Sequence, residues 1–161
     1  MPPTVHFELT GGAWHVQDFA WRHTLDNIEP AHSGAMPPPQ ALPAYDDSSW
    51  QLVDAPHDMG IEGPIDYTYP ADQGFRQRTA GWYRKHFQIP SEWKGSSVWV
   101  YIEGSFHVTN SYFNGKHLGE HPAGYTSFWL KLSDGAKWGQ ENVLALHVNA
   151  TTGTGWQVAA S

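Results

Sequence analysis

The feature that most constrains the fold is the stretch from residue 81 to residue 149, in which apolar and polar side chains alternate in short runs. The runs are separated by Gly, Asn, Pro or Asp, which are residues typical of turns. Because successive side chains of a strand point to opposite faces of a sheet, this pattern predicts half-buried antiparallel strands joined by tight turns. No window shows a sustained helical period. We therefore expect an all-β sandwich.

The clearest local signal is a β-hairpin. Residues 107–113 meet residues 116–119 across Asn114-Gly115, and Asn-Gly tolerates the positive φ angles that a type I′ turn requires. Residues 98–103 carry large side chains on both faces, which indicates a central strand. Further strands are expected at residues 51–53, 82–89, 128–132 and 142–148, with a hairpin at the edge of the sandwich at residues 5–16.

The run at residues 82–89 departs from strict alternation. Its alternate residues do not form one clean apolar set, because the phase is interrupted near Arg84 and His86. The residues concerned are Tyr83, Lys85, Phe87 and Ile89. An extra residue in a strand produces such a change of phase, so we predict a β-bulge there.

Length and loop signals predict a single domain over residues 1–161. A chain of this length buries roughly two-thirds of the surface that it exposes when unfolded. Residues 22–44 contain too many prolines for regular structure and are expected to form an extended surface loop. Residues 55–80 form a second long loop, and long loops in compact domains are often functional. The tail, residues 150–161, is interpreted as a truncated linker.

Charge and composition exclude several classes of function. The net charge is −7 and no Lys/Arg cluster is present, which argues against nucleic-acid binding. The chain has no Cys, so it forms neither disulfides nor thiolate metal sites. His117 and His121 are expected on opposite sides of a turn, so we predict no metal site and no cofactor. No membrane-spanning segment or signal peptide is recognised, which favours a cytoplasmic location.

A second pattern consists of seven segments in a fixed order between residues 45 and 149: Tyr45-Asp46-Asp47-Ser48-Ser49-Trp50, Ala55-Pro56-His57-Asp58, Gly81-Trp82-Tyr83-Arg84-Lys85, Glu103-Gly104, Phe113-Asn114-Gly115-Lys116, His121-Pro122-Ala123-Gly124-Tyr125-Thr126-Ser127-Phe128 and Glu141-Asn142-Val143-Leu144-Ala145. Together they resemble the N-terminal sugar-binding domain of glycoside hydrolase family 2, the family of β-galactosidases, β-glucuronidases and β-mannosidases. A single piece such as Asn-Gly is a weak signal, whereas the ordered set is specific.

The resemblance implies a jelly-roll β-sandwich of the galactose-binding-domain type, built from two antiparallel sheets. In full-length members this domain precedes an immunoglobulin-like domain and a (β/α)8 barrel. The implied partners are therefore those downstream domains together with a β-galactoside or related sugar. An oligomer is possible for the full-length enzyme.

The resemblance places the chemistry elsewhere. Retaining glycoside hydrolysis needs two carboxyl groups about 5 Å apart. In the family both are glutamates of the barrel, and the acid/base glutamate follows an Asn. This chain contains no Asn-Glu dipeptide. We therefore expect no catalytic residue here, no activity from the chain alone, and a non-catalytic domain that contributes a loop to the sugar pocket of a barrel.

Two residues of the second loop are candidate sugar contacts. Asp66-Tyr67-Thr68-Tyr69-Pro70 resembles the loop by which the first domain of large β-galactosidases reaches the barrel, where an Asn-Val-Thr-Tyr-Pro run presents its Asn to sugar hydroxyls. Asp66 can accept from two hydroxyls, but it lacks the amide donor. The alternative for Asp66 is a solvated loop residue, and Tyr67 is the second candidate.

Three further residues complete the candidate set. Trp156 is similar to the first Trp of the run that leads into the next domain, although the chain departs from the family pattern after it. His57 and Asp58 match another family motif. We expect them to position the loop by hydrogen bonding rather than to touch the sugar.

Two alternatives remain open. An independent lectin-like module would bind a glycan through exposed aromatic residues such as Tyr125, Trp129 or Trp138, although Trp in a sandwich is more often part of the core. A small glycosidase in its own right would use two of Asp58, Glu62, Asp66 and Asp72. Asp46 and Asp47 also form a carboxylate pair in the sequence, but we predict that they cap the turn before Trp50.

Overall fold

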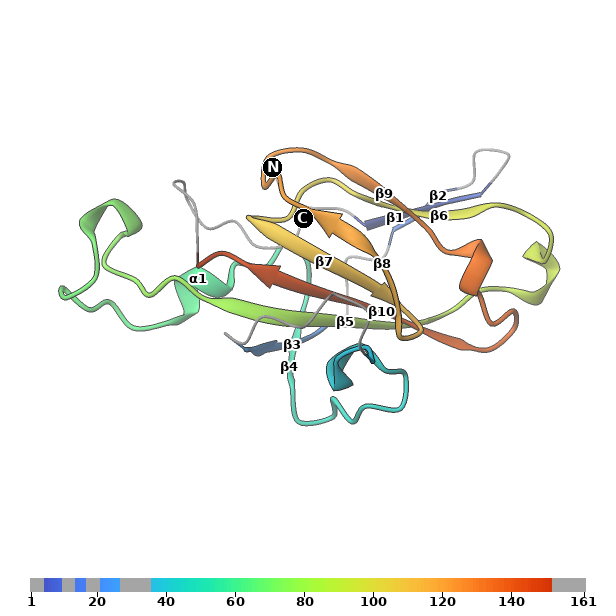
Figure 1. Ribbon diagram of the computed structural model, residues 1–161, viewed down its shortest axis with the longest axis horizontal. Helices are drawn as coiled ribbons and strands as arrows, with labels where there is room; N and C mark the ends of the chain where they lie inside the picture. The colour runs from blue at the N-terminus through green and yellow to red at the C-terminus, as the bar shows by residue number, and fades with distance from the viewer. Residues whose placement is uncertain (1–4, 10–13, 17–20, 27–35, 152–161) are drawn as a thin grey trace.

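The computed structural model describes residues 5–9, 14–16, 21–26 and 36–151. Within these residues two antiparallel β-sheets face each other as two layers (Figure 1). The four-stranded sheet has the order β2-β1-β6-β9, and the six-stranded sheet has the order β4-β3-β5-β10-β7-β8. This arrangement confirms the predicted all-β sandwich.

The strands are three to nine residues long. The four-stranded sheet contains β1 (Val5–Leu9), β2 (Trp14–Val16), β6 (Val98–Ile102) and β9 (Phe128–Lys131). The six-stranded sheet contains β3 (Trp21–Leu25), β4 (Gln51–Val53), β5 (Ala80–Gln88), β7 (Val108–Phe113), β8 (Lys116–His121) and β10 (Glu141–Asn149). The helical turns are α1 (Met59–Glu62), η1 (Pro39–Ala41), η2 (Ala71–Gln73), η3 (Ser91–Trp93) and η4 (Ser133–Gly135). Among the described residues, no helix is both long and apolar enough to cross a membrane.

Strand alternation places the main core between the two sheets. Val98, Val100 and Ile102 of β6 point into this core. Alternate residues of β10, from Leu144 to Val148, enter it from the other sheet. Strand β6 pairs with β1 on one side and β9 on the other, which confirms its central position.

The predicted hairpin joins β7 to β8. Asn114 and Gly115 have φ angles of 49° and 86°, as a type I′ turn requires. The register of this hairpin shifts between Ser111 and Tyr112, so a bulge-like irregularity lies here. Residues 5–9 and 14–16 also pair antiparallel at the edge of their sheet, as predicted.

The bulge predicted near Arg84 and His86 is wrong. Strand β5 pairs with β10 in unbroken register from Ala80 to Gln88. Tyr83 and Phe87 face the core between the sheets, whereas Arg84 lies on the opposite face, buried beneath residues 38–50. The polar residues do not break the alternation, because both faces of this strand are covered.

The carboxylates of Asp46 and Asp47 have different roles. Asp46 caps its turn as predicted, accepting from the Ser48 N–H at 3.0 Å. Asp47 instead accepts from the Arg84 guanidinium at 2.6 Å and contacts His86 Nε2 at 2.8 Å. Asp47 therefore fixes residues 38–50 to β5 rather than capping a turn.

The expected extent of the first loop is also wrong. Strand β3 occupies part of the predicted Pro-rich loop 22–44 and pairs with both β4 and β5. Residues 21–25 precede the first proline of that region, Pro30, so they can complete the hydrogen bonding of β5. The second loop contains α1 and η2, and β5 begins at Ala80.

His117 and His121 both lie in β8, so the turn expected between them is wrong. His117 Nε2 donates to Asn110 at 3.0 Å, and His121 Nε2 contacts the Thr126 hydroxyl at 3.0 Å. Within the described part of the chain, no group of three His, Cys, Asp or Glu residues could hold a metal ion.

Candidate functional site

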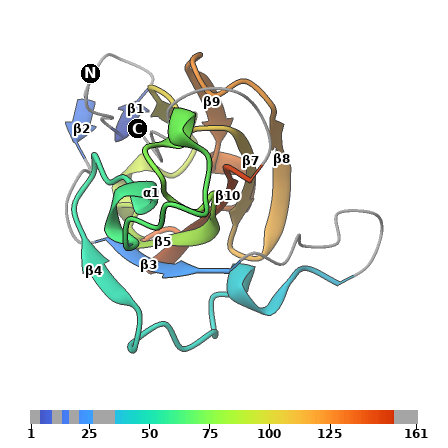
Figure 2. The same ribbon diagram turned by 90° about the vertical axis from the view of Figure 1, so that its left-hand side faces the viewer.

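The loop of residues 55–79 projects from the end of the sandwich at which β5 begins (Figures 1 and 2). The Asp66 N–H donates to the Phe75 carbonyl at 2.8 Å, which closes the outer part of the loop. The Arg76 guanidinium donates to the carbonyls of Ile61, at 2.6 Å, and of Gly63. These bonds give the loop a defined conformation.

Asp66 begins a tight turn in this loop. Its Oδ1 accepts from the Thr68 N–H at 2.9 Å and from the Thr68 hydroxyl at 2.8 Å. These two hydrogen bonds lower the pKa of the exposed carboxyl group, so it is ionised at neutral pH. Because both bonds use Oδ1, an external hydroxyl group can still approach Oδ2.

Tyr67, beside Asp66, is 81% exposed. Its ring lies 4.9 Å from the Phe75 ring, which supports one edge. Ile61 and Ile65 of the same loop are also exposed, so apolar side chains gather at this end of the molecule. The third candidate, Trp156, lies outside the described residues.

His57 connects the loop to the six-stranded sheet. Its Nδ1 lies 2.8 Å from the hydroxyl of Tyr83 in β5, and its Nε2 lies 2.9 Å from a carboxylate oxygen of Glu62 in α1. A carboxylate only accepts, so Nε2 carries the proton and the neutral ring accepts the Tyr83 O–H at Nδ1. Gln51 of β4 donates to the same Glu62 carboxylate at 2.9 Å.

Asp58 starts the helix α1. Its side chain accepts from the Gly60 N–H at 2.8 Å, as an N-cap residue does. Burial raises the pKa of its carboxyl group, although the hydrogen bond from Gly60 opposes this rise. His57 therefore contacts β5 and α1, and Asp58 caps α1.

Two residues of this site were missed in the sequence. Burial raises the pKa of the Tyr83 hydroxyl well above its usual value, so it stays protonated as a donor. The ring of His23, in β3, stacks on Tyr83 with centroids 4.5 Å apart and lies 4.8 Å from the His57 ring. The one available signal was the alternation of Trp21 and His23 on one side of a strand.

The acidic residues of the loop serve as local acceptors. Glu62 binds His57 and Gln51; burial would raise its pKa, but these hydrogen bonds outweigh burial and lower it. Asp58 caps α1 and Asp66 caps its turn. Asp72 lies in the first turn of η2. Three of the four acidic residues considered for hydrolysis are therefore held by neighbouring donors.

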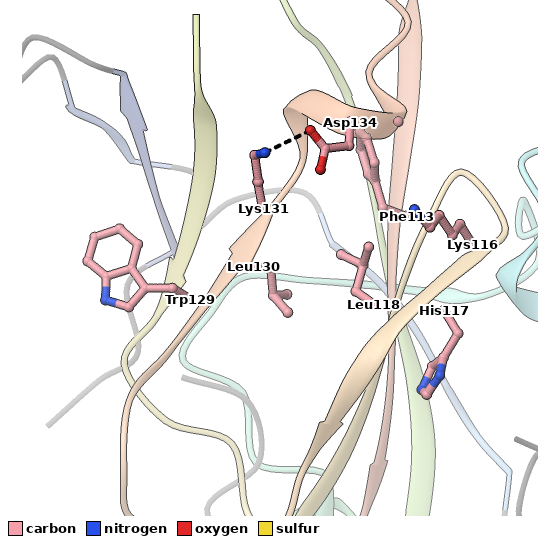
Figure 3. A pocket seen from close by; sticks show the side chains of 9 residues that line it. Phe113, Lys116, His117, Leu118, Trp129, Leu130, Lys131 and Asp134 are labelled. Carbon is pink, nitrogen blue, oxygen red and sulfur yellow. Dashed lines mark ion pairs between the residues drawn. The ribbon is translucent and has the colours of Figure 1, made fainter.

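A separate pocket of about 220 Å³ lies between β8 and β9, the edge strands of the two sheets (Figure 3). Leu118 and Leu130 point toward each other across it. At its rim Lys131 and Asp134 form an ion pair at 2.8 Å. The pocket lining includes a single carboxylate, so it lacks the two acidic groups of a glycosidase.

The aromatic residues considered for a lectin are dispersed. Trp129 is 44% exposed, and the centroid of its ring lies 4.6 Å from that of Tyr101. Tyr125 is exposed and contacts Phe106. Trp138 packs against the main core, so the expectation that it is an exposed aromatic is wrong.

Known proteins show similarity over most of this chain. Residues 45–154 match the model of a family described as the β-galactosidase second all-β domain. A β-glucuronidase of Formosa agariphila is 31% identical over 112 residues, and a β-galactosidase of Thermoanaerobacter pseudethanolicus is 35% identical over 107 residues. These alignments cover 68% and 66% of this chain.

The same architecture occurs in solved enzymes. A β-glycosidase from Bacteroides vulgatus superimposes with a TM-score of 0.72 at 29% identity, covering 89% of this chain and 18% of that one. A β-glucuronidase from glycoside hydrolase family 2 gives a TM-score of 0.70 at 25% identity, covering 95% of this chain and 14% of that one.

The chain spans 11% to 14% of the length of the two curated relatives. The resemblance implied the first domain of such enzymes, whereas the matching family model is described as a second all-β domain. The chain therefore belongs to the β-galactosidase second all-β domain family and corresponds to one domain of glycoside hydrolase family 2 enzymes.

Proposed function

We propose that this chain is a non-catalytic, sugar-binding β-sandwich of a family 2 glycoside hydrolase, in the N-terminal position and with a jelly-roll arrangement. Its role is to support a barrel domain and to contribute loop 55–79 to the sugar pocket of that barrel. The observation that carries the proposal is the ordered loop, which holds an ionised Asp66 and an exposed Tyr67 at one end of the sandwich.

The geometry of Asp66 suits recognition of hydroxyl groups. Oδ1 is held by Thr68, so the carboxylate has a fixed direction before any sugar arrives. A charged acceptor forms stronger hydrogen bonds than a neutral one, by roughly a factor of two. The Tyr67 ring offers an apolar surface beside it for the C–H face of a sugar ring.

The charge of Asp66 also favours one class of substrate. A uronic acid would place a second carboxylate near Asp66, and two like charges repel. A neutral β-galactoside brings only hydroxyl groups. We therefore propose a β-galactoside rather than a β-glucuronide as the sugar beside this loop.

The exposed Ile61 and Ile65 support docking of the loop against another domain. Burying these apolar side chains against another domain would stabilise docking by about 25 cal/mol for each Å² of apolar surface removed from water. His57 and Asp58, which connect the loop to β5 and begin α1, act as positioning residues in this proposal.

A domain exchange tests the proposal. Residues 45–151 replace the matching segment in the β-galactosidase of Thermoanaerobacter pseudethanolicus, and hydrolysis of 4-nitrophenyl β-galactoside is measured. We expect an active hybrid whose KM rises about 10-fold or more on Asp66→Ala, because a hydrogen bond to a charged group contributes about 1.5–3 kcal/mol. The matched control is Asp72→Ala, which leaves KM unchanged. Equal KM values for the two variants would contradict the role of Asp66.

A lectin-like module is the second candidate function. The observation that favours it is the exposed Trp129, whose ring lies against Tyr101. Calorimetric titration of the isolated chain with galactosides and β-linked oligosaccharides separates the two readings. Binding that is lost in Trp129→Ala and kept in Asp66→Ala supports the lectin; no binding by the isolated chain supports a loop that works only beside its barrel.

A further inference from the structure

A pair of histidines lies beneath α1, between the loop and the six-stranded sheet. We propose that this pair is an acid-sensitive latch: protonation of His23 releases residues 55–63, including α1, from β5. Because the same loop carries Asp66 and Tyr67, its release would also weaken sugar binding. That consequence rests on the proposed function. The latch itself does not depend on it.

His23 is placed where a charge is costly. Its side chain is 2% exposed and is stacked on the Tyr83 ring. Nδ1 lies 3.0 Å from the Trp82 carbonyl, which can only accept, so Nδ1 carries the proton of the neutral ring. Nε2 is buried and has no hydrogen-bond partner in the described part of the chain. A second proton on Nε2 would therefore be buried without an acceptor.

His57 adds to this cost. The two imidazole rings lie 4.8 Å apart, so two positive charges here would repel each other. His57 already has partners at both nitrogens, Tyr83 at Nδ1 and Glu62 at Nε2. His57 therefore cannot accept a hydrogen bond from His23 while these contacts persist.

Met59 of α1 contributes to the cover over His23. Met59, the first residue of α1, is buried and hydrogen-bonds through its backbone to the Tyr83 hydroxyl. An added Cβ at Gly81 would lie 2.9 Å from His23 Cε1 and 3.2 Å from the Met59 sulfur, which shows how closely the three groups approach. In the proposed latch, lifting α1 from β5 removes Met59 from His23 and lets water reach the ring.

Three other charged groups surround the latch, namely Glu62, Asp58 and Arg76. Glu62 and Asp58 face it from α1 and its cap, and Arg76 is held at the Ile61 and Gly63 carbonyls. Gln51 of β4 is a neutral partner of Glu62. Glu62 is bound to His57 and Gln51, and its charge offsets only part of the lowering of the His23 pKa.

The expected size follows from linkage. Burial, followed by the nearby His57, lowers the pKa of His23 from 6.5 to about 4. An open form in which His23 is solvated regains the ordinary value. Because the open form then binds the proton more tightly, its population relative to the closed form rises about 30-fold between pH 7.5 and pH 5.

Amide hydrogen exchange of the intact chain tests the latch. After correction for the intrinsic effect of pH on exchange, opening of residues 59–62 is expected to increase about 30-fold from pH 7.5 to pH 5. In His23→Asn, whose side-chain amide can still donate to the Trp82 carbonyl, this increase should disappear. His121→Asn, a matched change in β8, should leave it intact.

Two results would overturn the latch. One is corrected exchange at residues 59–62 that does not change with pH, and the other is an increase that persists in His23→Asn. Should that variant not fold, an NMR titration of the wild-type imidazoles decides: His23 titrating near pH 6.5 with unchanged α1 amides contradicts the proposal. No sugar or turnover enters these measurements, so failure of the latch and failure of the proposed function are distinguishable.

Discussion

Arg84 offers the sharpest test of how this sandwich is held together. Its side chain is 0% exposed, yet it carries a charge at the centre of the six-stranded sheet. The guanidinium donates to Asp47 at 2.6 Å, to the Leu42 carbonyl at 3.1 Å, to the Tyr45 carbonyl at 3.4 Å and to the Gln40 carbonyl. Arg84 therefore makes four hydrogen bonds that attach residues 40–47 to β5.

Replacing Arg84 by Met removes all these donors and leaves the Asp47 carboxylate buried with His86 as its remaining partner. Breaking a buried ion pair in this way costs about 3–5 kcal/mol. Since a domain of this kind is stable by about 5–15 kcal/mol, the variant should lose a large part of its free energy of unfolding. Urea denaturation followed by tryptophan fluorescence measures the loss.

Arg22→Met is the matched control, because Arg22 is the cross-strand neighbour of Arg84 in β3. Arg22 is only partly buried and, among the residues that the structure describes, donates one long bond, at 3.3 Å, to the Trp50 carbonyl. Its replacement should cost under about 1 kcal/mol. The double variant Arg84→Met, Asp47→Leu should recover much of the loss, since an apolar pair can replace a buried ion pair. Equal effects of the Arg84 and Arg22 variants would refute this reasoning.

Three further predictions concern the same framework. Burial acts to raise the pKa of Asp47, but hydrogen bonds from Arg84 and His86 outweigh it and lower the pKa. Asp47 therefore stabilises the fold at pH values above the ordinary carboxyl pKa, and this stability is lost as pH falls through the lowered value. Asp47→Asn should remove this part of the acid dependence, which urea titrations below about pH 4 measure. Gly81→Ala should cost about 1–3 kcal/mol in the same assay, because its Cβ would lie 2.7 Å from the Thr24 carbonyl, whereas Gly63→Ala, with nothing within 4 Å, should be within about 1 kcal/mol of wild type. Tyr83→Phe should lower the free energy of unfolding by about 1–3 kcal/mol, because it leaves His57 Nδ1 without its donor, and should speed amide exchange at residues 59–62. A loss of global stability with unchanged exchange at these residues would contradict the assigned contact.

The parts of the fold that sequence reasoning predicted are those encoded locally. The β7–β8 hairpin follows from Asn114-Gly115, and β6 follows from strict alternation at Val98, Val100 and Ile102. In these cases the turn chemistry and the side-chain period determine the structure without reference to distant residues.

The errors arise where distant segments cover a face. The expected bulge near Arg84 assumed that a charged residue interrupts a strand, whereas Asp47, 37 positions away, buries and neutralises it. Strand β3 was assigned to a loop because its role, pairing with β5, depends on residues about 60 positions further along the chain.

The candidate site shows the same division. The cap at Asp58 and the turn at Asp66 involve residues two positions apart, so both are encoded locally, although Asp58 was expected only to position the loop and Asp66 to contact a sugar or solvent. The contact of His57 with Tyr83 spans 26 positions, and the stack of His23 on Tyr83 joins β3 to β5. Neither contact could be derived before the sheet order was known.

The central claim is that this sandwich helps to place a sugar but does not cleave its bond. The most direct measurement is hydrolysis of 4-nitrophenyl β-galactoside and β-glucuronide by the purified 161-residue chain. The account predicts a rate equal to the uncatalysed reaction for both substrates. Turnover that is abolished by Asp66→Asn or Glu62→Gln would contradict it, because it would show that these acidic residues act as a catalytic pair.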